Sequence, residues 1–180
     1  MPQARQTKTG TKKLSEVAKH LVLPTGITKS GFPAVRDQLA KLDVTLDEWQ
    51  SGLGRSMLAK RANGLYAAGI GGIIISICRQ VGKTFTVGAI IFALCILFPG
   101  LKVLWTAHRA RTSDETFKWM QGFARQRKIA PHVLIVRQAN GQQEILFKNK
   151  SRIMFGAREG GCGRGFDGVD VEVFDEAQIL

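Results

Sequence analysis

The residues with the clearest chemistry form a short glycine-lysine-threonine sequence near the middle of the chain. Gly82, Lys83 and Thr84 follow an apolar run, Ile73–Ile77, and precede a long apolar segment, Phe85–Phe98. A buried strand, a tight turn and a helix in this order are the context in which a loop wraps phosphate groups. Backbone N–H groups and the positive end of the helix dipole attract the anion there. The stretch therefore predicts a polyphosphate-binding loop.

Each residue of this loop has its own expected role. Gly82 lets the backbone approach an anion, Lys83 reaches the β- and γ-phosphates, and the Thr84 hydroxyl binds Mg²⁺. The usual pattern has another glycine five positions before Gly82, where this chain has Ile77. The alternative interpretation is a plain turn before a buried helix, with an exposed lysine.

Two adjacent carboxylates near the end of the chain are the expected partner of this loop. Asp175 and Glu176 end a mostly apolar strand that begins at Val169. In phosphate-loop enzymes a strand of the same sheet delivers such an acid to the magnesium ion. We expect Asp175 to bind Mg²⁺, directly or through water, and Glu176 to orient and deprotonate the attacking water. Taken alone, the pair is more typical of a helix N-terminus, where acids favour the dipole.

Length and composition limit the class of the protein. With 180 residues, 44% of them hydrophobic, the chain has enough apolar material for about one domain. The net charge of +12 and the pI near 10.1 favour a polyanionic partner, nucleic acid first and an anionic membrane second. Widely spaced cysteines indicate a reducing compartment, and the histidines lack the spacing of zinc ligands.

Neither a membrane span nor an export signal is expected. Phe85–Phe98 is too short to cross a bilayer and suits a buried helix, and Met1–Lys13 lacks the apolar core of a signal peptide. The basic residues of that N-terminal stretch predict a disordered tail. We expect this tail and short helices over residues 1–44, followed by one domain over residues 45–180.

A capping box, Thr45–Glu48, predicts the start of a helix that continues to about Arg61. Trp49 and Gln50 lie in its first turns. A glutamine amide can donate to and accept from the adenine edge at once, and a tryptophan ring packs beside it. The plainer interpretation, which this stretch alone favours, is a surface glutamine next to a core tryptophan.

The second half of the chain predicts further strands and one helix. Leu101–Trp105 indicates a buried strand, parallel to the first in a right-handed βαβ unit. A second capping box, Thr112–Glu115, predicts a helix to about Lys128. Asn140 and Gly141 form a strong hairpin signal. The strands expected around and after that turn are His132–Arg137, Gln143–Phe147 and Arg152–Phe155.

These motifs, in this order, resemble one known family. The pair Trp49-Gln50, the sequence CRQVGKT at Cys78–Thr84 and the sequence FDEAQ at Phe174–Gln178 are similar to the N-terminal ATPase region of the large terminase subunit of tailed bacteriophages. That subunit is the motor that packages viral DNA. The similarity covers residues 46–180. Its Arg-Gln-x-Gly-Lys-Thr form lacks the first glycine, in keeping with this chain.

The resemblance implies a P-loop NTPase fold of the additional-strand, RecA-like type, which is an α/β fold with a mostly parallel sheet flanked by helices. It also implies ATP and Mg²⁺ as cofactors. Thr84 and Asp175 would bind the metal and Glu176 would be catalytic. The residues that would contact the nucleotide are Trp49, Gln50, Arg79, Gln80, Val81, Gly82, Lys83 and Thr84.

The resemblance also implies an arginine finger. An arginine that stabilises the developing phosphoryl charge is worth about 10³ to 10⁵ in rate. Arg79, inside the loop, would act in cis, whereas Arg164, in a glycine-rich stretch, would reach a neighbouring subunit of a ring. Both remain open, with Arg164 favoured because the exposure and mobility expected of a glycine-rich loop suit the task.

In the resembled family a coupling motif, further strands and a nuclease domain would follow beyond Leu180. We therefore expect an N-terminal portion, truncated at its C-terminal side, with weak or absent ATP turnover alone and no nuclease activity. The implied function is translocation of double-stranded DNA into a procapsid. The implied partners are that DNA, the portal protein, the small terminase subunit and further copies in a ring, at the portal vertex in the host cytoplasm, with no membrane.

Two other classes stay open. A helicase-like ATPase stimulated by nucleic acid also pairs a glutamine with a phosphate loop and an Asp-Glu strand, and it would need a second motor domain. A non-catalytic nucleic-acid-binding module with a vestigial nucleotide site is the other alternative. The retained Lys83, Thr84, Asp175 and Glu176 argue against the latter.

Overall fold

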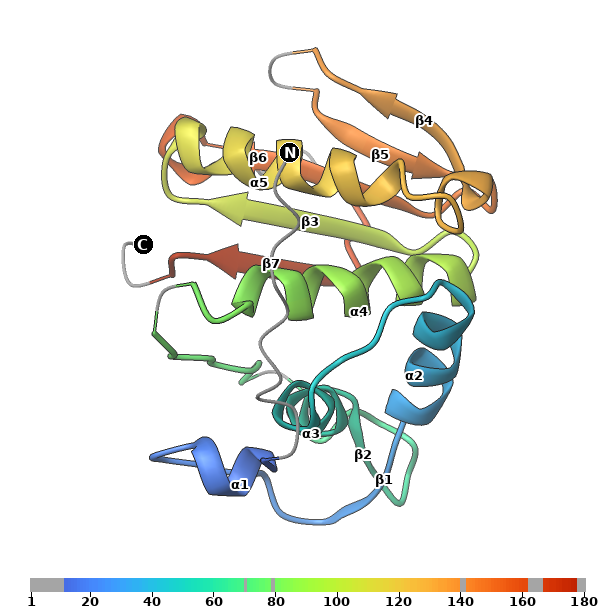
Figure 1. Ribbon diagram of the computed structural model, residues 1–180. Helices are drawn as coiled ribbons and strands as arrows, with labels where there is room; N and C mark the ends of the chain where they lie inside the picture. Colours follow the sequence, from blue (N-terminus) through green and yellow to red (C-terminus); the bar gives the residue numbers. More distant parts are fainter. Residues whose placement is uncertain (1–11, 70, 79, 140–141, 162–166, 178–180) are drawn as a thin grey trace. The chain divides into compact units, whose positions relative to one another are not determined.

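The computed structural model describes residues 12–69, 71–78, 80–139, 142–161 and 167–177 (Figure 1). The chain divides into two compact units, an N-terminal unit, Met1–Thr86, and a C-terminal unit, Val87–Leu180. The division falls inside one long helix, α4, which runs from Lys83 to Leu97. No helix among the described residues combines the length and apolarity needed to cross a membrane.

The N-terminal unit contains short helices and a small antiparallel sheet. The helices are α1 (Leu14–Val17), α2 (Phe32–Lys41) and α3 (Glu48–Met57), and the sheet pairs β1 (Ile27–Ser30) with β2 (Ala59–Arg61). One face of α2 forms the core, since Phe32, Val35 and Leu39 are each 1% exposed. A Cβ at Gly54 of α3 would lie 2.3 Å from Cε2 of Phe32, so this glycine lets the two helices pack closely.

Helix α4 is apolar on every side. No side chain from Thr86 to Cys95 is more than 8% exposed. A helix without a polar face is typical of one buried on all sides, in agreement with this low exposure. The expected buried helix over Phe85–Phe98 is therefore confirmed.

The C-terminal unit is built on a five-stranded mixed sheet of order β4-β5-β6-β3-β7. Its strands are β3 (Lys102–Ala107), β4 (Val133–Arg137), β5 (Glu144–Phe147), β6 (Arg152–Ala157) and β7 (Val171–Asp175). The central strand β3 runs parallel to both β6 and β7, and β5 pairs antiparallel with β4 and β6. The expected α/β class is confirmed, but the sheet is mixed rather than mostly parallel because the β4–β5 hairpin adds antiparallel pairs.

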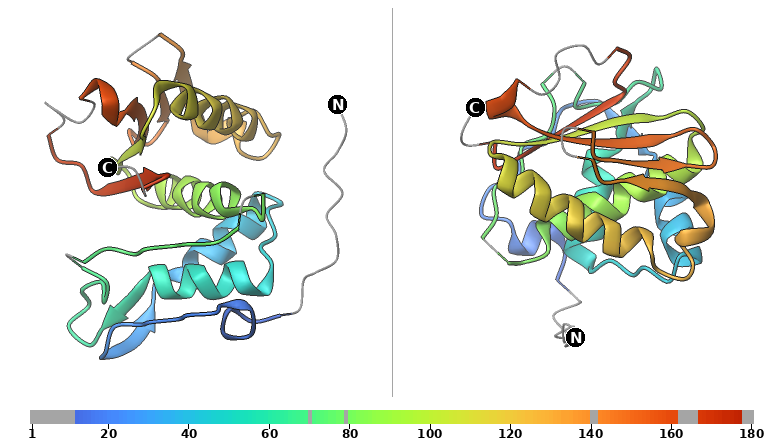
Figure 2. Two further views of the ribbon diagram at one scale, coloured as in Figure 1. Left: turned by 90° about the vertical axis from the view of Figure 1, so that its left-hand side faces the viewer. Right: turned by 90° about the horizontal axis from the view of Figure 1, so that it is seen from above.

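Helix α5 (Ala110–Ala124) covers one face of this sheet, packed against β3 and β6 (Figures 1 and 2). Its expected buried face is confirmed, since Phe117, Met120 and Phe123 are at most 4% exposed. Phe117 meets Phe155 of β6 with ring centroids 5.0 Å apart. The short 3₁₀ helices η1 (Ala130–His132) and η2 (Arg158–Gly160) complete the described elements.

Several sequence-based boundaries were wrong. Ile73–Ile77 is irregular rather than a strand, and Ile74 is 94% exposed. No described strand pairs with this segment, and a strand forms only where a neighbouring strand accepts its hydrogen bonds. The parallel neighbours of β3 are β6 and β7 instead. The helix predicted to run to Arg61 ends at Met57, where β2 follows shortly.

Both predicted capping boxes are displaced. Helix α3 begins at Glu48 with Asp47 as its N-cap, two residues after Thr45. Helix α5 begins at Ala110, before Thr112, and its N-terminal N–H is capped by a residue distant in sequence: the Ala110 N–H donates to Oε1 of Glu159 at 2.8 Å. A tertiary cap thus replaces the local one.

The predicted hairpin and the last two strands agree with the structure within a few residues. Val133–Arg137 and Glu144–Phe147 pair antiparallel, and β6 and β7 lie where strands are expected. The Asn140-Gly141 turn itself lies outside the described residues. These successes share a cause, because each strand is a short apolar run bounded by turn residues.

The C-terminal end of α4 is capped by the turn between β5 and β6. Nδ2 of Asn149 donates to the carbonyls of Cys95 and Ile96 at 2.7 and 3.2 Å, and the Ser151 hydroxyl donates to the Cys95 carbonyl at 2.6 Å. Helices leave their last carbonyls without intrahelical donors, so these bonds satisfy buried acceptors. Burial raises the pKa of the Cys95 thiol to about 12, against a smaller lowering by its hydrogen bond with Ser151.

Phe92 of α4 is the natural probe of this core. It is 0% exposed, and its ring lies 4.9 Å from that of Phe123 and 5.4 Å from that of Phe147, centroid to centroid. We expect Phe92→Ala to lower the free energy of unfolding by about 3–5 kcal/mol, because it leaves a cavity between two rings. Urea unfolding followed by circular dichroism measures the loss.

Phe98→Ala is the matched control for this prediction. Phe98 is 49% exposed, just after the same helix, so we expect it to cost about 1 kcal/mol or less. Equal losses for the two variants would contradict the packing described here.

Candidate functional site

The predicted phosphate loop has an unusual backbone. Gln80 has a φ of 62° and Gly82 a φ of 88°, both in the left-handed region, which non-glycine residues rarely adopt. Lys83 is the first residue of α4, and the Thr86 N–H and hydroxyl both donate to the Gly82 carbonyl, at 2.9 and 2.8 Å. Two left-handed residues thus turn the chain into the N-terminus of a long buried helix.

Around that turn the predicted contact residues differ in exposure. Gln80 and Val81 are exposed, whereas Lys83 and Thr84 are half-buried in the first turn of α4. The first N–H groups of an α-helix have no intrahelical acceptor and form the positive end of its dipole. The arrangement is therefore suited to an anion, although the strand expected before it is absent from 72–78.

The structure brings Gln50 and Gly82 together. Gln50 is 6% exposed, and its Nε2 lies 3.2 Å from the position that a Cβ on Gly82 would occupy. Its Oε1 accepts the Asp47 N–H at 2.8 Å, which closes the capping box of α3. Gln50 is therefore buried rather than at the surface, and its amide oxygen is already bonded to the N-cap residue of α3. Trp49 beside it is half-buried.

The predicted acid pair lies in the C-terminal unit, at the carboxyl end of β7. Asp175 is the last residue of that strand and pairs with Ala107, the last residue of β3. One carboxylate oxygen of Asp175 accepts the Thr116 hydroxyl of α5 at 3.3 Å, and the other accepts the Glu176 N–H at 3.1 Å. Open α/β sheets bind ligands at this edge, so the location suits a functional carboxylate.

Glu176 follows directly in a turn. Its φ of 52° is left-handed, which costs a non-glycine residue about 1–2 kcal/mol. Strain of this kind gathers at functional sites, where the surrounding structure maintains it. Both acids are half-buried.

No role was predicted for Arg158, the residue that joins the ends of β3 and β7. Nη1 of Arg158 donates to the carbonyl of Thr106 at 3.0 Å, and its Nη2 donates to the carbonyl of Asp175, also at 3.0 Å. The only signal in the sequence was a basic residue at the edge of a glycine-rich stretch, which it shares with Arg164. Bonds across 52 residues leave no local pattern.

The described residues cover only part of the predicted site. Both arginine-finger candidates, Arg79 and Arg164, lie outside them. The loop and Gln50 belong to the N-terminal unit, and Asp175 and Glu176 to the C-terminal unit. In the parts of the chain that the structure describes, no three His, Cys, Asp or Glu side chains gather into a metal-binding cluster.

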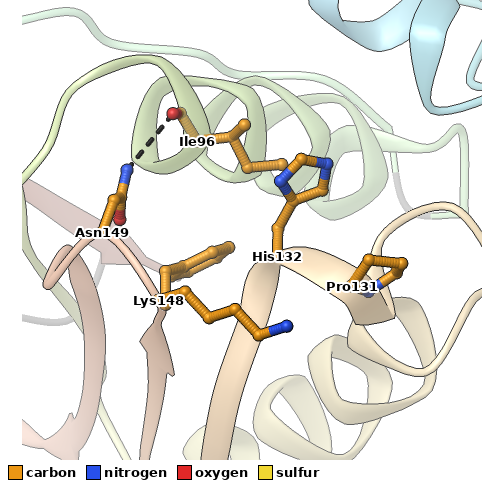
Figure 3. Close-up of a pocket in the computed structure, with 6 residues that line it drawn as sticks. Ile96, Pro131, His132, Lys148 and Asn149 are labelled. Carbon is orange, nitrogen blue, oxygen red and sulfur yellow. Dashed lines mark hydrogen bonds between the residues drawn. The ribbon is translucent and has the colours of Figure 1, made fainter.

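A small hollow of about 120 Å³ in the C-terminal unit is lined by none of the predicted site residues (Figure 3). The Asn149 amide on its wall is bonded to the Ile96 carbonyl and so belongs to the cap of α4. The residues that line it are Ile96, Pro131, His132, Phe147, Lys148 and Asn149.

No family model, curated protein or solved structure matches this chain.

The contact between Gln50 and Gly82 gives a test of the loop. We expect Gly82→Ala to lower the free energy of unfolding by more than Gly72→Ala does. Both glycines have positive φ, at 88° and 64°, which costs alanine about 1 kcal/mol or more, but a Cβ at Gly72 meets nothing within 4 Å. Chemical denaturation of both variants measures the difference.

A double variant separates the two causes. With Gln50→Ala in place, the Gly82→Ala change should cost no more than the Gly72→Ala change. A persisting excess would mean that Gln50 is not what confines Gly82.

Proposed function

We propose that this chain is the ATP-binding and ATP-hydrolysing portion of a motor that packages double-stranded viral DNA into a procapsid, as in the large terminase subunits that its motifs resemble. The loop is the observation that best supports the proposal. A left-handed Gln80 and Gly82 lead into a helix whose first residues are Lys83 and Thr84. That combination of backbone and side chains fits a polyphosphate bound at a helix N-terminus.

The chemical types of the predicted site residues suit ATP and Mg²⁺. Gly82 leaves room for a phosphate where a Cβ would intrude, Lys83 carries a positive charge and Thr84 has a hydroxyl. Asp175 offers a carboxylate at the carboxyl edge of a sheet. Mg²⁺ at nucleotide sites usually takes one or two protein oxygens and completes its shell with water and phosphate, so a dense cluster of acidic side chains is not required.

Within this proposal each residue has one task. Lys83 binds the β- and γ-phosphates, and Thr84 and Asp175 hold the metal. Glu176 orients the attacking water and accepts its proton, and an arginine, Arg164 or Arg79, stabilises the phosphoryl charge. A Mg²⁺ ion held by Thr84 and Asp175 would neutralise negative charge on the phosphates.

The proposed fold is the additional-strand P-loop NTPase, and the proposed partners are double-stranded DNA, the portal protein, the small terminase subunit and further copies in a ring. The net charge of +12 supports the first of these, because phosphate contacts by Lys and Arg dominate affinity for DNA. The proposed location is the portal vertex of a procapsid in the host cytoplasm.

The role of Lys83 is tested by ATP binding. We expect Lys83→Ala to weaken binding of Mg·ATP by about 10-fold to 100-fold, since a hydrogen bond to a charged group is worth about 1.5–3 kcal/mol. Isothermal titration calorimetry gives the dissociation constants. Lys41→Ala, an exposed lysine at the end of α2, is the control and should bind as the wild type does. Unchanged affinity of Lys83→Ala would reject the phosphate role.

The role of Glu176 is tested by single-turnover hydrolysis, with the protein in excess over labelled ATP so that slow rates are measured, with and without double-stranded DNA. We expect Glu176→Gln to bind ATP but to hydrolyse it about 10²-fold to 10⁴-fold more slowly, the usual contribution of a general base. Glu172→Gln, an exposed glutamate on the same strand, should keep the wild-type rate. A Glu176→Gln chain that hydrolyses ATP normally would rule out this base.

A further inference from the structure

Arg158 lies where the carboxyl ends of three parallel strands meet. It is the first residue of η2, directly after β6, and its guanidinium reaches the end of β3, the next strand in the sheet, and the end of β7, the strand beyond it. Nη1 donates to the carbonyl and to the hydroxyl of Thr106 on β3, at 3.0 and 3.1 Å. Nη2 donates to the carbonyls of Asp175 and Glu176, at 3.0 and 3.4 Å. One side chain therefore bonds to the ends of β3 and β7 together.

The backbone that carries Arg158 is itself fixed. The Glu159 N–H donates to the His108 carbonyl at 3.2 Å, and Oε1 of Glu159 accepts the Ala110 N–H at 2.8 Å. The first bond attaches η2 to the connection between β3 and α5, and the second attaches it to the first residue of α5. The guanidinium thus extends from an anchored base, which lowers the entropy lost in holding it across the strand ends.

A guanidinium suits this position. Its planar fork presents several N–H donors in fixed directions on separate nitrogens, whereas the three N–H donors of a lysine ammonium all lie on one nitrogen. The Arg158 Cζ atom also lies 5.6 Å from the centroid of the Phe174 ring, over its face, so the ring stabilises the cation.

The bonds of Arg158 end on the turn that is strained. Glu176 has a φ of 52°, and its conformation persists only if neighbouring groups hold it. The two carbonyls that Nη2 binds belong to Asp175 and Glu176 themselves. Loss of this donor would remove both of these bonds from the turn.

We propose that Arg158 is a positioning residue, which holds the turn at the end of β7, where Asp175 and Glu176 lie, beside the end of β3. The catalytic consequence rests on the proposed function, whereas the positioning does not. The two parts are tested separately, in the absence and in the presence of ATP.

The first experiment is hydrogen exchange of the full chain without nucleotide. In Arg158→Ala we expect amides of peptides covering Val171–Ala177 to exchange about tenfold faster or more, because bonds from a charged donor are lost, while peptides covering β5 stay as in the wild type. Arg127→Ala, an exposed arginine after α5, is the control and should change neither region. Unchanged exchange of Val171–Ala177 in Arg158→Ala would overturn the proposal.

Arg158→Lys is the second variant, for the case in which Arg158→Ala loosens the whole unit and β5 exchanges faster too. Lysine keeps the charge but not the fork, so we expect faster exchange confined to Val171–Ala177. Wild-type exchange in Arg158→Lys would mean that charge alone suffices, and it would overturn the bridging role.

The second experiment measures single-turnover ATP hydrolysis. We expect Arg158→Ala to retain the wild-type affinity for ATP within about threefold and to lose at least about tenfold in rate, because it displaces groups that act on the reacting atoms rather than those that bind phosphate. Added ethylguanidinium, at concentrations far below denaturing ones, should restore part of the rate, and an alkylammonium of equal charge should not. A purely structural role would lower stability without this rescue.

The outcomes separate the two proposals. If the wild type does not hydrolyse ATP, the hydrolytic part of the proposed function fails for this chain, and hydrogen exchange still decides whether Arg158 holds the turn. If the wild type hydrolyses ATP and Arg158→Ala does so equally fast, the catalytic part of this inference fails while the proposed function stands.

Discussion

The parallel pairing of β7 with β3 is the constraint that sets the position of Asp175 and of the turn that follows it. The register sets Asp175 beside Ala107 and Phe174 beside Thr106. Because side chains alternate along a strand, a slip of one residue would move Asp175 to the opposite face of the sheet. Asp175 meets the Thr116 hydroxyl of α5 only because the observed register turns it to the helix-covered face.

That register is held at both ends and in the middle. At the amino ends the Lys102 N–H donates to the Asp170 carboxylate and the Asp170 N–H to the Lys102 carbonyl, each at 2.9 Å. In the middle the Thr106 hydroxyl donates to the Val173 carbonyl at 3.3 Å. Arg158 bonds to both strands at the carboxyl ends. Side chains thus supplement the ladder of an edge strand that has only one described neighbour, which explains how a short strand keeps a fixed position.

How much of the fold was predictable depended on whether the cause was local. Helix α5 shows its buried face at helical spacing, and the β4–β5 hairpin follows from short apolar runs around a turn signal, so both could be predicted. Ile73–Ile77 has the composition of a buried strand, but a strand also needs a partner, which a local pattern does not report. The start of α5 failed for a related reason, since its cap, Glu159, is distant in sequence.

The candidate site shows the same difference between local and distant causes. Sequence predicts which residue types have a suitable chemistry, and the structure shows Gln50 buried beside Gly82. What sequence could not show is how these groups are held. Gln50 is oriented by the N-cap of its own helix, whereas the acid turn is held by Arg158 from another strand end. The predicted phosphate loop therefore depends on the left-handed backbone of Gln80 and Gly82. The turn at Asp175 and Glu176 depends on hydrogen bonds from the guanidinium of Arg158. Substitutions should accordingly disturb the first through steric strain and the second through lost donors.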